Sequence, residues 1–461
     1  MAHQRFGTRT ATAGIDRTTV AALADEHLDW RFKALPPEAW GRTTRAYLAS
    51  SPHLSDLGTP LLTLDAGALD HNLRTMAAWC HEAGVTLAPH GKTTMAPALW
   101  QAQLDAGAVG VTLANLPQLH VARAFGVQRL MLANALVDPA GLAWIAGELA
   151  ADPDFAFLSW ADSVRTVTLM DEALRAAGVG SGPDPETDRP IDVVVELGGE
   201  GGRTGARSIA EAEDVAQAVR AAPTLRLAGV AGYEGALAHD AAAGSLATVR
   251  TYLRDLAELH RRLAPTYETD HPVVTAGGSA YFDLVAEVLV PAVRESAAEV
   301  VVRSGAYVIH DDGYYRGISP LSRTAATAAS ASAAANGDSF RSAMHGWARV
   351  VSQPEPRLAL LDAGKRDLPF DEGLPVPQLV RGAGPARGIV TAMNDQHTFL
   401  RDATATATAT TTTTTTAPVG AVIRLGLSHP CTALDKWTLI PVLDDADSAD
   451  PKVVDLVRTF F

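Results

Sequence analysis

The sequence predicts an α/β protein made of a (β/α)8 barrel and a second, mainly antiparallel β domain. Between residues 85 and 302, short apolar segments alternate with helical patterns, which requires parallel strands joined by crossover helices. After residue 302, segments of alternating polarity such as 357–362 are separated by proline and glycine turns, which is typical of antiparallel strands. The length of 461 residues suits two units with separate cores.

Eight strands can be drawn in the barrel region, and eight is the number that closes this barrel. An earlier segment, 59–65, also has the pattern of a strand, and an amphipathic helix over 68–83 follows it and ends at Gly84. Because this strand is additional to the eight, we expect it to pair in the β domain. The eight expected barrel strands are 85–88, 109–113, 129–132, 155–159, 193–196, 227–231, 273–275 and 300–302.

These patterns divide the chain into three parts. Residues 1–58 are expected to form an N-terminal extension that packs on the body, 59–318 the barrel, and 319–461 the β domain. Residues 402–418 are almost entirely alanine and threonine. Such a segment cannot bury a core, so we expect a flexible surface loop there.

Composition restricts the possible partners and the compartment. A formal net charge of -14 argues against nucleic acid and against an anionic membrane surface, so a small-molecule partner is favoured. The N-terminus has no apolar signal region, and no apolar run is long enough to span a bilayer. Two cysteines, Cys80 and Cys431, cannot build a disulfide framework and fit a reducing compartment. We therefore expect a cytoplasmic protein.

The segment around Lys92 is the first candidate for chemistry. It follows the first expected barrel strand, and barrel enzymes keep their chemistry at the C-terminal ends of the strands. Side chains alternate along a strand, so Thr86, Ala88 and His90 share one face and Lys92 follows at the same spacing. An amine in this place could be a Schiff-base lysine. The alternative is a solvated loop lysine.

Two glycine segments at the last two strands favour a phosphate site. Gly277 and Gly278 let backbone N–H groups approach a phosphate, Ser279 adds a hydroxyl, and a helix expected near Tyr281 adds its positive end. The segment 301–307, with Gly305, supplies a second loop for the same dianion. The loops after strands seven and eight are the usual phosphate loops of barrels. The alternative for the first segment is a simple turn.

Two further residues follow the fifth and sixth strands. Arg203 lies in the glycine-rich stretch 196–205, which does not match a dinucleotide fingerprint. Arg203 is permanently charged, and a surface ion-pair arginine is the alternative to a functional one. Tyr233 lies in Gly-Tyr-Glu-Gly. The alternative to a functional tyrosine is a half-buried core tyrosine.

His429 and Cys431 form a possible metal pair in the β domain. They lie two residues apart with a proline between them, and an imidazole and a thiolate can share one zinc ion. A catalytic zinc usually takes three protein ligands, and only two are evident. Water and substrate, or a residue that we cannot name, would complete the coordination. A buried cysteine beside a turn histidine is the alternative.

His-Gly-Lys-Thr at 90–93, together with the segments above, resembles the fold-type III pyridoxal-phosphate enzymes that contain the alanine racemase N-terminal domain. The branch is that of D-serine dehydratase and D-threonine aldolase. The resemblance implies that Lys92 holds pyridoxal 5'-phosphate, that Arg203 and Tyr233 contact the cofactor ring, and that the two glycine loops form the phosphate cup. It also implies a homodimer in which both subunits build each active site.

The metal motif separates activities within this branch. D-serine dehydratases carry His-x-Cys as their zinc pair, whereas D-threonine aldolases carry His-x-Asp, and this chain has His429-Pro-Cys431. The resemblance therefore favours elimination of water over retro-aldol cleavage. One departure is Gly91-Lys92-Thr93-Thr94, where the aldolases often show a further histidine or lysine after the threonine.

The expected activity is conversion of D-serine to pyruvate and ammonia. Lys92 would take the Cα proton, His90 would tune or relay protons or orient the loop, and Zn2+ would act as a Lewis acid on the β-hydroxyl. Three alternatives stay open. They are an aldolase of D-threonine-like substrates, a dehydratase of another β-hydroxy D-amino acid such as D-threo-3-hydroxyaspartate, and a cofactor-binding protein without turnover.

Overall fold

The computed structural model describes residues 14–180, 189–323, 339–402 and 417–461. The chain divides into two compact units. The barrel unit comprises residues 76–92 and 100–305 and the segment up to residue 17, and the β unit comprises 18–75, 93–99 and 306–461. Residues 18–58, expected as an extension, thus cluster with the β unit. Most of the alanine- and threonine-rich segment 402–418 lies outside the described residues.

The barrel unit contains an eight-stranded parallel sheet in the order β2-β9-β8-β7-β6-β5-β4-β3. The two ends of this order meet, because the backbone N–H groups of Val109 and Thr112 donate to the carbonyl oxygens of Leu87 (2.8 Å) and Pro89 (2.9 Å). The predicted (β/α)8 barrel is thereby confirmed. The strands are β2 Thr86–Leu87, β3 Val111–Leu113, β4 Arg129–Leu132, β5 Ala156–Ala161, β6 Ile191–Leu197, β7 Leu225–Gly232, β8 Val273–Ala276 and β9 Glu299–Val302.

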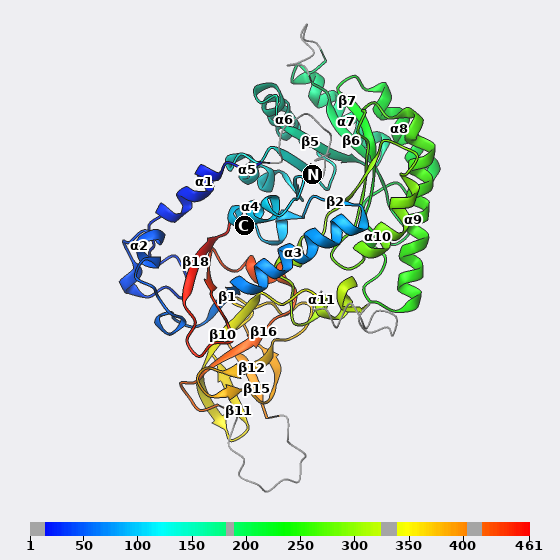
Figure 1. Ribbon diagram of the computed structural model, residues 1–461. Coiled ribbons are helices and arrows are strands. Elements are labelled where there is room, and N and C mark those ends of the chain that lie inside the picture. Colours follow the sequence, from blue (N-terminus) through cyan, green and yellow to red (C-terminus); the bar gives the residue numbers. More distant parts are fainter. Residues whose placement is uncertain (1–13, 181–188, 324–338, 403–416) are drawn as a thin grey trace. The chain divides into compact units, whose positions relative to one another are not determined.

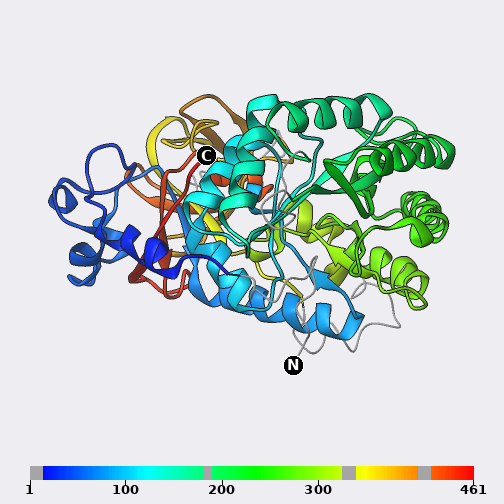
Figure 2. The ribbon, with the colours of Figure 1, turned by 90° about the horizontal axis from the view of Figure 1, so that it is seen from above.

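The barrel strands are buried on both faces, which explains why they form continuous apolar runs rather than alternating ones. Every residue of β4, β8 and β9 is buried, and Met131, Leu158, Trp160 and Val301 belong to one inner cluster. Helices surround the strands (Figure 2), and α8 packs on β6 and β7 (Figure 1). These helices are α5 Leu116–Ala124, α6 Pro139–Ala151, α7 Val164–Ala176, α8 Ile209–Ala221, α9 Ala243–Leu263 and α10 Phe282–Ala292.

Capping residues set the starts of several barrel helices. Asn115, Asp138, Ser163 and Ser208 each accept a hydrogen bond from the N–H group three residues later, which satisfies a donor that the helix leaves open. Each cap lies in the loop that follows a strand, so the loops are pinned at the strands' C-terminal ends. None of the helices in the described part of the chain combines the length and the apolar character that a membrane crossing requires.

The β unit is built on a ten-stranded sheet with the main order β13-β12-β16-β10-β1-β17-β18, from which β11, β15 and β14 branch. Leu61 of β1 pairs with Trp347 of β10 in antiparallel register, and Leu64 pairs with Val442 of β17 in parallel register. The strand expected at 59–65 therefore belongs to this sheet.

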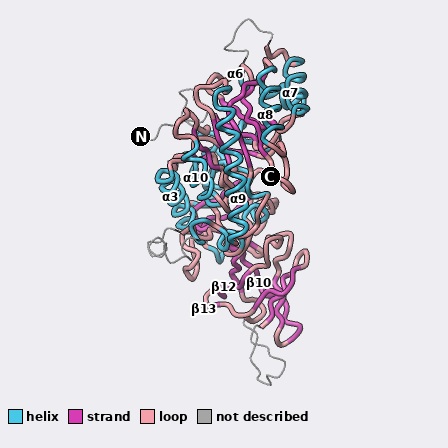
Figure 3. Tube along the Cα trace, turned by 90° about the vertical axis from the view of Figure 1, so that its right-hand side faces the viewer, coloured by secondary structure: helices cyan, strands magenta, loops and turns pink. Residues whose placement is uncertain are grey.

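The sheet of the β unit consists of ten strands. Figure 3 shows two of them, β10 and β12, in magenta. The strands are β1 Leu61–Asp65, β10 Met344–Glu355, β11 Leu358–Leu361, β12 Val376–Val380, β13 Gly384–Pro385, β14 Ile389–Met393, β15 Thr398–Arg401, β16 Val422–Gly426, β17 Leu439–Leu443 and β18 Val453–Arg458. The other described α-helices are α1 Arg17–Ala22, α2 Thr44–Leu48, α3 Ala66–Ala83, α4 Pro97–Asp105, α11 Tyr314–Ile318, α12 Pro320–Arg323 and α14 Pro430–Leu434.

Two buried histidines are expected to make the β unit sensitive to acid. Burial and the charge of Arg316 lower the pKa of His310 to about 4, and burial and Arg424 lower the pKa of His345 to about 4. Between pH 6.5 and 4 the unfolded chain binds protons that the folded chain does not. Stability therefore falls as the pH falls through this window, by up to about 3 kcal/mol for each histidine.

The variant His310→Asn tests this acid sensitivity. Asparagine tolerates the left-handed backbone of this position, where φ is +50°, but it does not titrate. Urea unfolding of the full chain between pH 8 and 4 should show a shallower loss of stability in the variant than in the parent. An unchanged slope would contradict the prediction.

Candidate active site

The lysine loop begins where β2 ends. His90 still forms a parallel bridge with Thr112, but residues Gly91–Thr93 then form one 3-10 turn. The strand alternation expected for Lys92 therefore stops at His90, and Lys92 lies in the turn. The indole of Trp100 donates to the carbonyl oxygen of Gly91 (3.2 Å), and a Cβ on Gly91 would lie 2.8 Å from that indole nitrogen. Only glycine lets the turn close in this way.

The second glycine loop lies against the lysine loop. The N–H group of His90 donates to the carbonyl oxygen of Arg303 (3.0 Å). A Cβ on Gly305 would overlap the carbonyl oxygen of His90, so this close approach requires glycine. The structure thus brings together the segments 90–92 and 303–305, which the sequence places more than two hundred residues apart.

Positive charge converges on His90. The Nδ1 atom of its imidazole is buried without a hydrogen-bond partner among the described residues. Burial and the charges of Lys92, Arg303 and Arg203 hold the pKa of His90 well below its ordinary value. The imidazole is therefore neutral, and three cationic groups lie within electrostatic reach of it. Such a concentration of one sign of charge attracts an anionic ligand.

Arg303, which follows β9, forms hydrogen bonds with residues near the ends of the two preceding barrel strands. Its guanidinium is buried and donates to the hydroxyl of Thr275 (2.6 Å) and to the carbonyl oxygen of Gly232 (2.7 Å). These contacts join the ends of β7, β8 and β9. Burial lowers the pKa of Arg303, and the nearby carboxylates of Glu234 and Glu196 counteract this. Arg303 is thus a buried cation balanced by two buried carboxylates.

Glu234 holds the first glycine loop. Its carboxylate accepts from the N–H groups of Gly277 (3.0 Å) and Gly278 (2.7 Å), and the residue is fully buried. Gly277 has a φ of +97°, which favours glycine. The two amides expected to bind phosphate are therefore bound to a side chain of the protein.

Glu234→Gln is expected to destabilise the barrel unit. The amide would turn an N–H group toward one of the two glycine N–H donors and leave it unsatisfied, which costs about 1–3 kcal/mol. Urea unfolding followed by circular dichroism measures the loss. Glu200→Gln, at an exposed glutamate of the neighbouring loop, is the matched control. Equal stability of the two variants would show that Glu234 does not hold the loop.

Arg203 and Tyr233 lie together at the ends of neighbouring strands. The guanidinium carbon of Arg203 is 4.5 Å from the centroid of the Tyr233 ring, within the range of a cation–π contact. Arg203 is exposed, whereas Tyr233 is half-buried. Burial, with the charge of Glu234, raises the pKa of the Tyr233 hydroxyl. The two residues expected to contact a cofactor ring are thus in contact with each other.

His429 and Cys431 flank Pro430 at the start of α14 in the β unit. Burial lowers the pKa of His429, but hydrogen bonds and charge from Cys431 and Asp371 outweigh it and raise the pKa to about 9. The imidazole and the thiol thus lie on either side of Pro430 and within electrostatic reach of each other. The thiol of Cys431 also lies 3.4 Å from the hydroxyl of Thr93, which belongs to the same unit.

The pair supplies two ligands. No group of three or more His, Cys, Asp or Glu side chains that could hold a metal ion occurs within residues 14–180, 189–323, 339–402 and 417–461. The donor set, one imidazole and one thiol, still suits zinc. Further ligands would come from solvent, from a bound molecule or from a residue outside the described ranges.

Comparison with known proteins identifies the family. Residues 64–294, half of the chain, match the family model described as "Alanine racemase, N-terminal domain". The chain belongs to this family. Residues 343–443 match a second model, "Putative serine dehydratase domain". The resemblance to fold-type III pyridoxal-phosphate enzymes of the D-serine dehydratase and D-threonine aldolase branch is thereby confirmed.

Two relatives of this alanine racemase-type chain cover most of its length. The D-threonine aldolase of Arthrobacter sp. is 27% identical over 379 residues, which are 82% of this chain and 86% of the relative. The D-threo-3-hydroxyaspartate dehydratase of Delftia sp. HT23 has the same fold, with a TM-score of 0.68 and 21% identity over 88% of this chain and 99% of that chain. Two further structures are variants of a D-threo-3-hydroxyaspartate dehydratase. A histidine-to-alanine variant has a TM-score of 0.69 and 21% identity, and the match covers 90% of this chain and 98% of that chain. A cysteine-to-alanine variant in the metal-free form has a TM-score of 0.67 and 21% identity, and the match covers 89% of this chain and 99% of that chain.

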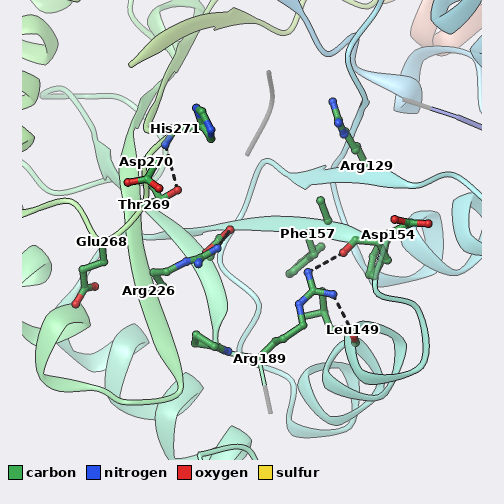
Figure 4. A pocket seen from close by; sticks show the side chains of 14 residues that line it. Arg129, Leu149, Asp154, Phe157, Arg189, Arg226, Glu268, Thr269, Asp270 and His271 are labelled. Carbon is green, nitrogen blue, oxygen red and sulfur yellow. Dashed lines mark hydrogen bonds and ion pairs between the residues drawn. The ribbon is translucent and has the colours of Figure 1, made fainter. Parts of the chain in front are cut away.

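The alanine racemase-type barrel also has a cavity of about 320 Å³ at the opposite ends of its strands (Figure 4). Arg129 and Ala156, which begin β4 and β5, line it. Two of its arginines have partners within the protein: Arg226 binds Asp192 at 2.8 Å, and Arg189 donates to the backbone carbonyl oxygens of Leu149, Asp152 and Phe155. This end of a barrel supports stability, and none of the expected site residues lies there.

The sequence placed Arg303 directly after the eighth strand but gave it no separate role. Two other residues of the site were missed. Glu234 lies beside Tyr233 in a segment that was singled out for the tyrosine. Asp371, which contacts His429, lies in a loop before β12, and nothing in its sequence context connects it with a histidine 58 residues later.

Proposed function

We propose that the chain is a pyridoxal-phosphate- and zinc-dependent lyase that removes water from a β-hydroxy D-amino acid, converting D-serine to pyruvate and ammonia. The observation that carries the proposal is the placement of His429 and Cys431 on either side of Pro430 at the start of α14. A dehydratase with this fold supports it. In that enzyme the altered histidine and cysteine of the two solved variants are two positions apart, and the cysteine variant is metal-free.

The residues at the C-terminal end of the barrel fit the cofactor. Three cationic groups lie within electrostatic reach of His90, and the buried Nδ1 atom of His90 has no partner among the described residues. The bound cofactor supplies a sink for the electron pair left on Cα. In the proposal, Lys92 would hold the cofactor, and its amine would be the base that takes the proton from Cα.

The metal pair completes the proposed chemistry. His429 and Cys431 hold the ion, and a zinc ion supplies a Lewis acid for the departing β-hydroxyl. The neutral His90 imidazole adds no positive charge beside Lys92, which helps the amine to accept a proton. Arg203 and Tyr233 are proposed to hold the cofactor ring, and Ser279 and Gly305 its phosphate.

A panel of D-amino acids tests the proposed function. The full chain, loaded with pyridoxal phosphate, is assayed metal-free and after zinc is restored, and keto acid and ammonia are both measured. We expect pyruvate and ammonia in equal amounts from D-serine, and only with zinc. Failure of every β-hydroxy D-amino acid to yield a keto acid would refute the proposal.

Retro-aldol cleavage is the second candidate, because the Arthrobacter relative is a D-threonine aldolase. Incubation with D-threonine would then release glycine and acetaldehyde rather than 2-ketobutyrate and ammonia. The panel separates the remaining alternatives as well. A dehydratase of D-threo-3-hydroxyaspartate gives oxaloacetate, whereas a protein that only binds the cofactor shows visible absorbance without any product.

A further inference from the structure

We infer that Asp371 is a positioning residue that holds the His429 ring so that its Nε2 atom faces the metal ion. The inference rests on the proposed function, because it takes His429 and Cys431 as the metal ligands. It goes beyond that function by giving a task to a carboxylate outside the ligand pair. Three contacts in the β unit carry it.

The first contact sets which nitrogen can bind a metal. Oδ2 of Asp371 lies 2.5 Å from Nδ1 of His429. An ionised carboxylate can only accept a hydrogen bond, so Nδ1 must carry the hydrogen. In the neutral ring the lone pair then lies on Nε2. A histidine that donates its other N–H to a carboxylate has both its tautomer and its orientation fixed, which is the usual arrangement around a metal-binding histidine.

The second contact fixes Asp371 itself. Its other oxygen, Oδ1, accepts from the hydroxyl of Thr432 (2.7 Å). Thr432 follows Cys431 in the first turn of α14, and its hydroxyl also lies 3.3 Å from the carbonyl oxygen of His429. One carboxylate therefore holds the ring of one proposed ligand and the residue after the other. These two contacts fix the positions of the two proposed ligands relative to each other.

The third contact holds the backbone rather than the ring. His429 has a left-handed backbone with φ +59°, which a non-glycine residue adopts only when its surroundings impose it. The buried carboxylate of Asp311 accepts from the N–H group of His429 (2.9 Å). Its other oxygen accepts from the N–H groups of Gly313 (3.0 Å) and Tyr315 (2.8 Å). With the main chain held by Asp311, only the side-chain torsions of His429 remain to be set, and Asp371 sets them.

Exposure distinguishes this role from a stabilising ion pair. The side chains of His429 and Asp371 are 23% and 38% exposed, and exposed pairs contribute little to stability. Removal of the Asp371 carboxylate should therefore leave the fold almost unchanged and weaken metal binding. A purely structural contact would change stability and leave the metal affinity as it was.

The experiment compares Asp371→Ala and Asp371→Asn with the parent in the full chain loaded with pyridoxal phosphate. Zinc affinity is measured by competition with a chromophoric chelator, and the thiolate-to-cobalt absorption band is recorded after cobalt(II) replaces zinc. We expect Asp371→Ala to bind zinc about 10- to 100-fold more weakly and to shift or lose the band. Asp371→Asn keeps an oxygen that can accept from Nδ1, so its loss should be smaller.

Asp435→Asn is the matched control, because it removes an exposed carboxylate from the end of the same helix without touching His429. It should bind zinc like the parent. Visible cofactor absorbance and the midpoint of urea unfolding show whether each variant is folded. If Asp371→Ala does not fold, the zinc affinity of Asp371→Asn tests the inference instead.

The ligand variants separate the two possible failures. If His429→Ala and Cys431→Ala lose zinc while both Asp371 variants keep the parent affinity and spectrum, the inference is wrong and the proposed metal pair stands. If His429→Ala and Cys431→Ala also keep the parent affinity, the metal pair is wrong, and the inference fails with it. If Asp435→Asn weakens zinc binding as much as the Asp371 variants do, the effect comes from the overall loss of negative charge. That result would overturn the inference.

Discussion

Lys92→Ala is expected to abolish covalent binding of pyridoxal phosphate and to lower the turnover of D-serine by about 10³–10⁴-fold or more. The variant loses both the amine that binds the cofactor and the base for the Cα proton. Borohydride reduction followed by peptide mass analysis locates the cofactor, visible absorbance reports its binding, and pyruvate release reports turnover.

Lys452→Ala is the control for this experiment, because it removes an exposed lysine of the β unit. It should keep the covalent cofactor and the parent rate. A reduced cofactor on any lysine other than Lys92 would contradict the assignment. So would parental turnover by Lys92→Ala.

Cys431→Ala is expected to keep the visible absorbance of the bound cofactor, to lose zinc, and to lower turnover by about a thousandfold. The loss corresponds to the several kcal/mol that a Lewis acid contributes to the departure of hydroxide. Metal analysis after gel filtration, the absorbance spectrum and pyruvate release measure the three effects. The pattern separates the metal site from the cofactor site, because Lys92→Ala should instead lose the cofactor absorbance.

The second cysteine provides a matched control. Cys80 is buried in α3, and burial raises the pKa of its thiol to about 12, so it is an unreactive core residue. Cys80→Ala should keep zinc and most of the activity. If Cys431→Ala turns over D-serine at the parent rate, the metal plays no part in the elimination.

Local patterns in the sequence were sufficient to find the barrel and the segments that carry its chemistry. Continuous apolar runs marked the eight strands because both faces of each strand are buried, and residues such as Asn115 and Ser163 end the loops by capping the next helix. Lys92, the glycine loops and His429-Pro-Cys431 could be singled out because each motif lies within a few residues. All of these signals are local, so no knowledge of distant contacts was needed.

The partners of these segments were decided only by the tertiary structure. Strand β1 pairs with β10 on one side and with β17 on the other. Glu234 binds the amides of Gly277 and Gly278, and Asp371 binds the ring of His429. Each contact joins residues from about 40 to almost 400 positions apart. Contacts at such separations leave no periodicity, cap or turn signal in the sequence, because folding brings the partners together only when the cores of the units form.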